Sequence, residues 1–301
     1  WSVDLADLPI NADKRSARLS GGLVSRYGKL FLGSENGVVY ALNEANGEVL
    51  WQTTVPGEVV ASPAVEDGRV VVLTTSGRLV ALDTDEGKLQ WTLSEEQPPL
   101  TLRSAGAPII TNGAVIYGRA DGKVGIALLS NGQPVRQSKV ADPRGATELD
   151  RMVDVDARPL IAGDELYAIA YNGQLMARKL MTGDEVWKRK YSGYRDMAVT
   201  GNAIVLTDSR SHLFAVDRRN GLELWSNTQL ENRTVTAPVI LGDYVVVGDV
   251  EGYLYWLDRT DGTIKAMQQL DSSGLYAAPL VEGDTLYVQS RDGKLYALKR
   301  P

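Results

Sequence analysis

One spacing recurs along this chain. The stretch ALDTDEGKLQW, from Ala81 to Trp91, places Ala, Asp, Gly and Trp at offsets of 0, 2, 6 and 10. The stretches ALNEANGEVLW (41–51) and AVDRRNGLELW (215–225) keep this spacing, and ARKLMTGDEVW (177–187) keeps it with Lys179 at the acidic position. Repetition at a fixed period determines the architecture of a chain before local propensities do.

The length of the repeat is given by the spacing of the turn glycines. Between them lie short segments rich in Val and Leu, such as RVVVLTTSGRLVALDTDEGKLQW (69–91), which predict four strands per repeat. The connecting hairpins are so short that neighbouring strands must be antiparallel. We therefore predict an all-β fold, a β-propeller of four-stranded antiparallel blades that forms one domain over residues 1–301. The first turn position is held by Gly37, Gly77, Gly122, Gly173, Ser211, Gly252 and Gly293, 38 to 51 residues apart.

The repeated Trp falls on the outermost strand of each blade. Gly77 and Gly87 permit the positive φ angles of two-residue hairpins and so delimit the third strand. The Trp ring can then cover the gap between two blades, whereas ligand-binding rings would have to converge on the propeller axis. Trp256 stands where Ala is expected, and we expect it to fill the space left by Ala266. We predict this docking role for Trp1, Trp51, Trp91, Trp187 and Trp225.

The two ends of the chain each provide part of a blade. Residues 277–301 contain three predicted strands, and WSVDL (1–5) resembles an isolated fourth strand. The seven sets of three inner strands are therefore consistent with two arrangements. Either the N-terminal strand completes the last blade, or it is the remainder of a blade that precedes residue 1.

Composition and motifs argue against several functions. A net charge of −6 and the absence of a basic stripe argue against a nucleic-acid partner. No apolar run approaches the length of a membrane span, and the absence of Cys excludes thiolate chemistry. We find no catalytic motif and no ligand set for a metal or cofactor, and His212 is expected to be a solvated hairpin residue. We therefore predict a non-enzymatic protein without a cofactor.

Two enlarged connections flank one predicted blade. They span residues 92–107 and 137–158, whereas most connections between blades are shorter. Because all such connections leave on one face, we expect these two to be neighbours. The first carries Leu100, Leu102 and Arg103 after a Pro-Pro pair, a composition typical of interface anchors. The second carries Glu148, Asp150, Asp154 and Asp156, which could orient Arg103 or meet a basic partner. Alternatively, the leucines only pack the loop and the acidic run is a solvated face.

The repeat resembles the tryptophan-docking motif of quinoprotein-like propellers. Within that superfamily, the connecting segments resemble the BamB family of the outer-membrane β-barrel assembly machinery. The segments that carry the resemblance are PPLTLRSAGAP (98–108), GATELDRMVDVDARP (145–159), AYNGQL (170–175), GDVEGYLYWLD (248–258) and LDSSG (270–274).

The resemblance implies a scaffold that docks on the POTRA domains of BamA at the periplasmic face of the outer membrane. It implies eight blades, and attachment through an N-terminal lipidated Cys that this chain lacks. Arg151 is expected to brace its loop, and unfolded outer-membrane clients could bind at blade edges. The partner-binding residues carried over are Leu100, Leu102, Arg103, Asp154 and Asp156.

Two alternative functions remain open. The superfamily contains quinone-dependent dehydrogenases, whose chemistry needs a quinone, a Ca²⁺ site and a general base. A bound cofactor would favour a periplasmic enzyme of that kind. If instead the enlarged loops were dispensable, a generic protein-interaction propeller would be the better interpretation.

Overall fold

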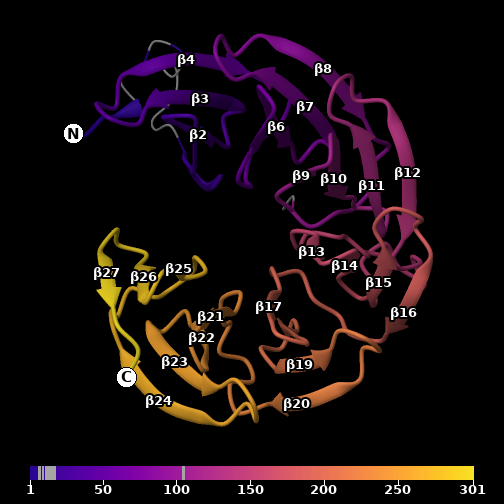
Figure 1. The fold of residues 1–301 in the computed structure, drawn as a ribbon, viewed down its shortest axis with the longest axis vertical. Helices are drawn as coiled ribbons and strands as arrows, with labels where there is room; N and C mark the ends of the chain where they lie inside the picture. Colours follow the sequence, from indigo (N-terminus) through magenta and orange to yellow (C-terminus); the bar gives the residue numbers. More distant parts are fainter. Residues whose placement is uncertain (6–7, 9, 11–17, 104–105) are drawn as a thin grey trace. The chain divides into compact units, whose positions relative to one another are not determined.

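The computed structural model describes residues 1–5, 8, 10, 18–103 and 106–301. The chain divides into two compact units, residues 1–159 and 160–301. Strands joined by turns and loops make up both units (Figure 1). Within the described ranges, no helix is long and apolar enough to cross a membrane. The single domain expected over residues 1–301 stays a prediction.

The first unit contains three antiparallel sheets of four strands, and each sheet follows the order of the chain. The predicted strand pattern is therefore confirmed here. The first sheet is β1 (Val24–Arg26), β2 (Lys29–Gly33), β3 (Val38–Asn43) and β4 (Val49–Thr54); the second is β5 (Ala64–Glu66), β6 (Arg69–Leu73), β7 (Arg78–Asp83) and β8 (Leu89–Ser94); the third is β9 (Ile109–Thr111), β10 (Ala114–Gly118), β11 (Lys123–Leu128) and β12 (Pro134–Lys139).

The second unit repeats this plan, and its last sheet has three strands in the described residues. Its strands are β13 (Leu160–Ala162), β14 (Glu165–Ile169), β15 (Leu175–Lys179) and β16 (Glu185–Arg189); β17 (Ala198–Thr200), β18 (Ala203–Thr207), β19 (Leu213–Asp217) and β20 (Glu223–Asn227); β21 (Val239–Leu241), β22 (Tyr244–Gly248), β23 (Tyr253–Asp258) and β24 (Ile264–Gln269); and β25 (Leu280–Glu282), β26 (Thr285–Gln289) and β27 (Leu295–Leu298).

The turn glycines do have positive φ angles, but the two-residue hairpins lie elsewhere. Gly77 (φ 73°) ends a four-residue turn between β6 and β7, and Gly87 (φ 65°) lies in a five-residue turn between β7 and β8, so the predicted two-residue turns are wrong at both positions. Two-residue turns instead join the first and second strands, as at Asp67 (φ 48°) and Gly68 (φ 71°). Ser211 takes the same conformation as the glycine that it replaces, with φ 72°.

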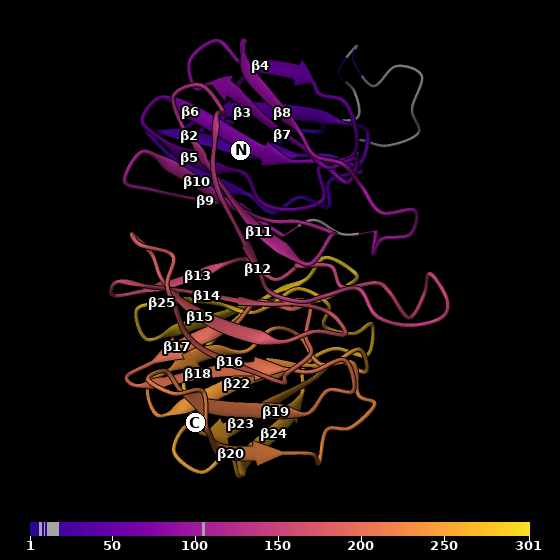
Figure 2. The same ribbon diagram turned by 90° about the vertical axis from the view of Figure 1, so that its right-hand side faces the viewer.

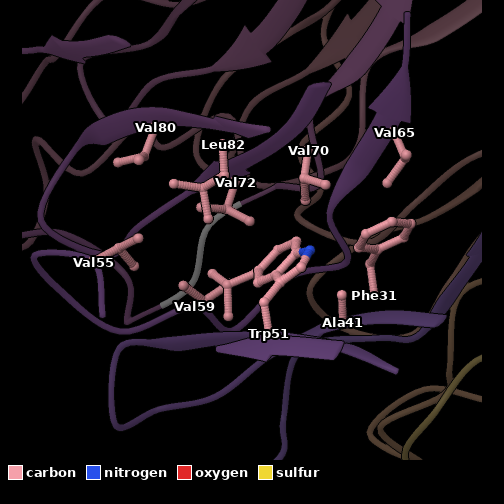
Figure 3. Close-up of a cluster of buried hydrophobic side chains, with 11 residues drawn as sticks. Phe31, Ala41, Trp51, Val55, Val59, Val65, Val70, Val72, Val80 and Leu82 are labelled. Atoms are coloured by element: carbon pink, nitrogen blue, oxygen red, sulfur yellow. The ribbon is translucent and has the colours of Figure 1, made fainter. Parts of the chain in front are cut away.

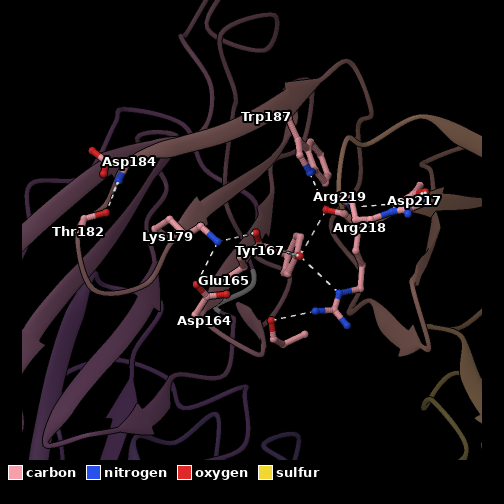
Figure 4. Close-up of polar contacts among 11 residues, drawn as sticks. Asp164, Glu165, Tyr167, Lys179, Thr182, Asp184, Trp187, Asp217, Arg218 and Arg219 are labelled. Carbon is pink, nitrogen blue, oxygen red and sulfur yellow. Dashed lines mark hydrogen bonds and ion pairs between the residues drawn. The ribbon is translucent and has the colours of Figure 1, made fainter.

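The acidic position of the repeat closes the turn after the third strand. Asp83 Oδ1 accepts hydrogen bonds from the backbone N–H groups of Asp85 (2.8 Å) and Glu86 (3.0 Å). Lys179 cannot accept such bonds. Its Nζ instead reaches Asp164 Oδ2 (3.0 Å) and Glu165 Oε1 (3.1 Å), as Figure 4 shows. An ion-pair cluster therefore replaces the carboxylate turn in this sheet.

Within each unit, clusters of buried hydrophobic residues lie between consecutive sheets. Figure 3 shows the cluster between the first two sheets, where Trp51 of β4 packs among Val59, Val70 and Val72. The Trp51 indole N–H donates to the Thr84 carbonyl oxygen at 3.0 Å. Ala41 lies opposite Trp51 in the β3–β4 register, where its small side chain leaves room for the ring.

The other repeated Trp residues make the corresponding contact with the next sheet. The Nε1 atoms of Trp91, Trp187 and Trp225 donate to the carbonyl oxygens of Leu129 (2.8 Å), Arg218 (2.7 Å, Figure 4) and Arg259 (2.9 Å). Trp1 donates to the Glu44 carbonyl oxygen at 3.1 Å, although 63% of the residue is exposed. Trp256 lies opposite Ala266 in the register and packs against Leu286 and Val288 of the next sheet. In this sheet the Trp and the Ala have therefore exchanged strands, and the ring still lies between two sheets.

The second turn glycine is constrained by these rings as well as by its φ angle. A Cβ atom at Gly87 would lie 2.5 Å from the Trp51 ring, and one at Gly132 would lie 2.5 Å from the Trp91 ring. The same relation holds for Gly221 with Trp187. Gly and Trp therefore recur together because each ring lies against the turn glycine of the next sheet.

Candidate functional site

The enlarged connections on either side of the third sheet are neighbours, as the sequence predicts. They join β8 to β9 and β12 to β13, and both extend to the same side of the first unit, at the right of Figure 2. Between them lies a groove of about 410 Å³. A Cβ atom at Gly106 would lie only 2.6 Å from the Asp156 carbonyl oxygen. The backbones of the two connections are therefore in direct contact at Gly106 and Asp156.

The first connection presents the predicted anchors to different extents. Leu100 is 41% exposed and lines the groove beside Pro98 and Pro99. Leu102 is half-buried, whereas 65% of the Arg103 side chain is exposed. A protruding Leu next to an accessible guanidinium, on a segment stiffened by two prolines, is the composition of an interface anchor.

Asp154 lies beneath this loop. The residue is only 1% exposed, so its side chain is not on the outer surface, and the partner-binding role carried over from the resemblance stays a prediction. Its Oδ1 accepts the backbone N–H of Leu102 at 2.9 Å, and its Oδ2 has no hydrogen-bond partner among the described residues. Burial raises the pKa of the Asp154 carboxyl to about 6. Asp154 therefore fixes the loop backbone from inside, and Asp156 is partly buried beside it.

Arg103 is held by two carboxylates that the sequence did not reveal. Its Nε and Nη2 donate to Glu58 Oε2 (3.0 Å) and Oε1 (2.8 Å), and Nη2 also donates to Glu35 Oε2 (2.9 Å). The suggestion that acidic residues of the second connection orient this Arg is therefore wrong. Glu35 and Glu58 belong to the β2–β3 and β4–β5 connections, 68 and 45 residues upstream, and no local pattern links them to Arg103.

The second connection is organised by its own side chains. Arg151 Nε donates to the Gly145 carbonyl oxygen at 3.0 Å, and its Nη1 contacts Glu148 Oε1 at 3.3 Å. Asp150 Oδ2 accepts the backbone N–H of Thr147 at 3.2 Å. Arg151 therefore braces this loop, as the sequence predicts, and forms one wall of the groove.

A buried ion pair supports the groove from below. Arg119 Nη1 lies 2.5 Å from Glu95 Oε2, and both side chains are close to fully buried. The Tyr117 hydroxyl donates to Glu95 Oε1 at 2.5 Å, and burial together with this carboxylate raises the pKa of the phenol. Arg119 Nη2 also contacts Asp121 Oδ2 at 2.9 Å. The third sheet thus offers a fixed base on which the two connections rest.

The histidine is not a solvated hairpin residue, so that expectation is wrong. His212 is 6% exposed, and its ring makes an edge contact with Phe214. Its Nδ1 lies 3.0 Å from Asp208 Oδ2, and its Nε2 lies 3.6 Å from Glu231 Oε1. In the part of the chain that the structure describes, no group of three or more His, Asp or Glu side chains could hold a metal ion.

Solved structures define the class of this fold. The crystal structure of BamB from Moraxella catarrhalis matches with a TM-score of 0.89 at 27% identity, covering 94% of this chain and 85% of that one. A quinohemoprotein alcohol dehydrogenase from Pseudomonas putida matches with a TM-score of 0.71 over 90% of this chain and 62% of that one, at 12% identity, which shows the fold alone. The protein is an all-β propeller with seven blades of the four-stranded antiparallel type, the last represented by three strands in the described residues. The eight blades implied by the resemblance stay a prediction.

Sequence relatives define the family. The family model of the outer membrane protein assembly factor BamB matches residues 1–227 and 228–300, and the chain belongs to this family. BamB of Shewanella oneidensis is 45% identical over 229 residues, which cover 76% of this chain and 58% of the relative. The chain therefore spans less than two thirds of that relative's length. The relatives are named as assembly factors, in agreement with the predicted non-enzymatic role.

Proposed function

We propose that this chain is a non-enzymatic scaffold subunit in the assembly of outer-membrane β-barrel proteins. It docks on the POTRA domains of BamA through the loop of residues 98–103 and works at the periplasmic face of the outer membrane. Family membership supports the assembly role, because the relatives are named for it. The specific partner comes from the resemblance of the two enlarged connections to those of the family.

The observation that carries the docking site is the construction of the loop. Leu100 and Arg103 project from a segment whose backbone is held by the buried Asp154 carboxylate through Leu102. A loop fixed in this way loses little conformational entropy when a partner binds, so its contacts contribute more fully to affinity. Asp154 and Asp156 act in this proposal as supports of the docking surface, beneath the residues that touch the partner.

Neither alternative function has a comparable observation in its favour. The likeness to a quinohemoprotein dehydrogenase is limited to the fold. A generic interaction propeller would not explain why the accessible Leu and Arg lie on a loop that is braced from below. Client strands remain a second class of partner, which the outer strands β4, β8 and β12 could bind by strand addition.

The docking site is tested by measuring binding of the purified chain to isolated BamA POTRA domains by calorimetry. We expect Leu100→Ala and Arg103→Ala each to weaken binding by about thirtyfold, since truncating an interface anchor costs about 2 kcal/mol. Both residues are exposed, so stability should change by less than about 1 kcal/mol.

Two matched variants serve as controls. Leu222→Ala truncates a Leu that is 56% exposed on another blade, and Arg219→Ala removes an exposed Arg that is paired with Asp217. Both should bind POTRA domains like the unmodified chain. Unchanged affinity in both Leu100→Ala and Arg103→Ala would refute the docking site, and a large drop in their melting temperatures would show that the loop serves packing.

A further inference from the structure

The Arg103 side chain joins three loops of the first unit through ion pairs. It lies in the β8–β9 connection, and its guanidinium contacts Glu58 in the β4–β5 connection and Glu35 in the β2–β3 turn. The contact with Glu58 is bidentate, with Nε to Oε2 at 3.0 Å and Nη2 to Oε1 at 2.8 Å. Such paired, parallel hydrogen bonds fix the plane of a guanidinium as well as its position.

The backbone segments that carry the two carboxylates are held in place. The carbonyl oxygen of Glu58 accepts the backbone N–H of Thr75 at 3.0 Å, and the backbone N–H of Glu35 donates to the Arg18 carbonyl oxygen at 2.9 Å. Their side chains are only 33% and 25% exposed, whereas that of Arg103 is 65% exposed. Glu35 and Glu58 therefore form a partly buried receptor on fixed backbone segments, and the Arg103 side chain lies over it with most of its surface accessible.

This cluster contributes little to folding stability. Ion pairs with one partner this exposed are screened by solvent and contribute less than about 1 kcal/mol. The loop backbone is separately anchored by the bond from Leu102 N–H to Asp154. Holding the guanidinium thus changes the conformational freedom of an accessible side chain, which matters for binding more than for the fold.

We propose that Glu58 and Glu35 are positioning residues for the docking surface: they hold the Arg103 guanidinium in the orientation in which it meets the partner, without touching the partner themselves. This inference rests on the proposed function. The free chain then already contains Arg103 in its binding geometry, and the partner need not order this long, flexible side chain. Arg103 and Leu100 present a cation and an apolar group on the same loop, a surface suited to a partner patch that contains a carboxylate and an apolar residue.

The test is a double-mutant cycle measured by calorimetry with isolated BamA POTRA domains. Glu58→Gln keeps the shape of the side chain but removes the negative charge and replaces one carboxylate oxygen by an NH2 group, which cannot accept a hydrogen bond from the guanidinium. We expect Glu58→Gln, and more strongly the double variant Glu35→Gln/Glu58→Gln, to weaken binding by about threefold to tenfold. In the Arg103→Ala background the same substitutions should have no further effect. Glu66→Gln, which removes a comparable exposed pair with Arg26 (2.7 Å), is the matched control and should leave affinity unchanged.

A second measurement follows Arg103 directly in the free protein. The Nε–H proton of Arg103, which donates to Glu58, should exchange with solvent more slowly than that of an exposed Arg, and Glu58→Gln should abolish this protection. Tighter binding by Glu58→Gln would mean that the carboxylates sequester Arg103. Equal weakening in the Arg103→Ala background would mean that they touch the partner, and unchanged affinity would mean that they do not position Arg103. Each of these results overturns the inference while the docking site stands, whereas unchanged affinity in both Leu100→Ala and Arg103→Ala overturns both.

Discussion

At the scale of single residues, the fold depends on pairs of side chains that belong to different sheets. Trp51, Trp91, Trp187 and Trp225 are each opposite an Ala in their own sheet and lie against a turn glycine in the next one, as Trp51 does with Ala41 and Gly87. The indole N–H also satisfies a carbonyl group in that next sheet. One residue therefore supplies apolar burial and a hydrogen bond across the same boundary.

Truncating such a ring should destabilise the first unit strongly. Trp91 is 8% exposed and packs with Val71, Tyr117 and Leu129. We expect Trp91→Ala to lower the free energy of unfolding by about 3 to 5 kcal/mol, the range for removing a large buried aromatic side chain. Leu89→Ala, two positions earlier with 61% exposure, should cost far less. Chemical denaturation of both variants measures this difference, and equal losses would contradict a docking role for the ring.

The role of the turn glycine can be separated from its backbone conformation. Gly87 and Gly68 both have positive φ, at 65° and 71°, but a Cβ atom would lie 2.5 Å from the Trp51 ring at Gly87 and would meet nothing within 4 Å at Gly68. We expect Gly68→Ala to cost about 1 kcal/mol from backbone strain alone. Gly87→Ala should cost at least about 1 kcal/mol more, because the ring must move. Similar unfolding free energies for the two variants would show that the ring adjusts without cost.

Asp154 gives a prediction with a defined pH dependence. Its carboxyl pKa is raised from 3.8 to about 6, so the folded state binds this proton more tightly than the unfolded state does. The stability linked to the protonated form is present below about pH 4 and is lost as the pH rises through 6. We therefore expect Asp154→Asn, which stays neutral and can still accept the Leu102 N–H, to stabilise the protein by about 1 to 3 kcal/mol at pH 7.5.

The stabilisation by Asp154→Asn should diminish as the pH is lowered toward 4, where the native carboxyl is itself protonated. Urea unfolding of the variant and the unmodified chain at both pH values measures the effect. Affinity for POTRA domains should be kept, because the residue is buried below the surface. A less stable variant at pH 7.5 would mean that the carboxylate is compensated by a cation.

At the scale of elements, the hairpins repeat while the connections between sheets differ. The β18–β19 turn shows how a departure from the repeat is accommodated. Ser211 stands in place of the usual Gly with φ 72°, and its Oγ accepts the backbone N–H of Val235 at 3.2 Å in a buried position. The hydroxyl thus ties the turn to the β20–β21 connection, which offsets the strain of a side chain in this conformation.

Because the hydrogen bond offsets the backbone strain, two substitutions of Ser211 should destabilise the protein by different amounts. Ser211→Ala keeps the strained backbone and leaves the buried Val235 N–H without its acceptor, and we expect a loss of about 1 to 3 kcal/mol. Ser211→Gly also loses the acceptor but relieves the strain, so it should be less destabilising by about 1 kcal/mol. Thermal melts of both variants provide the measurement. If Ser211→Gly were the less stable of the two, backbone strain would not matter at this turn.

At the scale of the whole chain, the sequence predicted what is periodic and missed what is not. The glycine and Trp spacing led to the strands, their antiparallel order and the neighbouring enlarged connections. It did not reveal that Asp154 is buried, because a carboxylate in an acidic loop resembles a solvated residue. Contacts of Arg103 with Glu35 and Glu58 depend on how sheets follow one another in space, and burial of His212 depends on the neighbouring connection. Such contacts have no local signature in the sequence.

The central claim is that the loop of residues 98–103 meets BamA, and site-specific photo-crosslinking tests it most directly. A photoreactive amino acid replaces Leu100 in the protein exported to the periplasm of a Gram-negative cell, and another replaces Leu222 as the control. After irradiation of intact cells, we expect a BamA adduct from position 100 that maps to its POTRA domains, and none from position 222. Equal adducts from both positions, or an adduct to BamA from position 222 alone, would contradict the account.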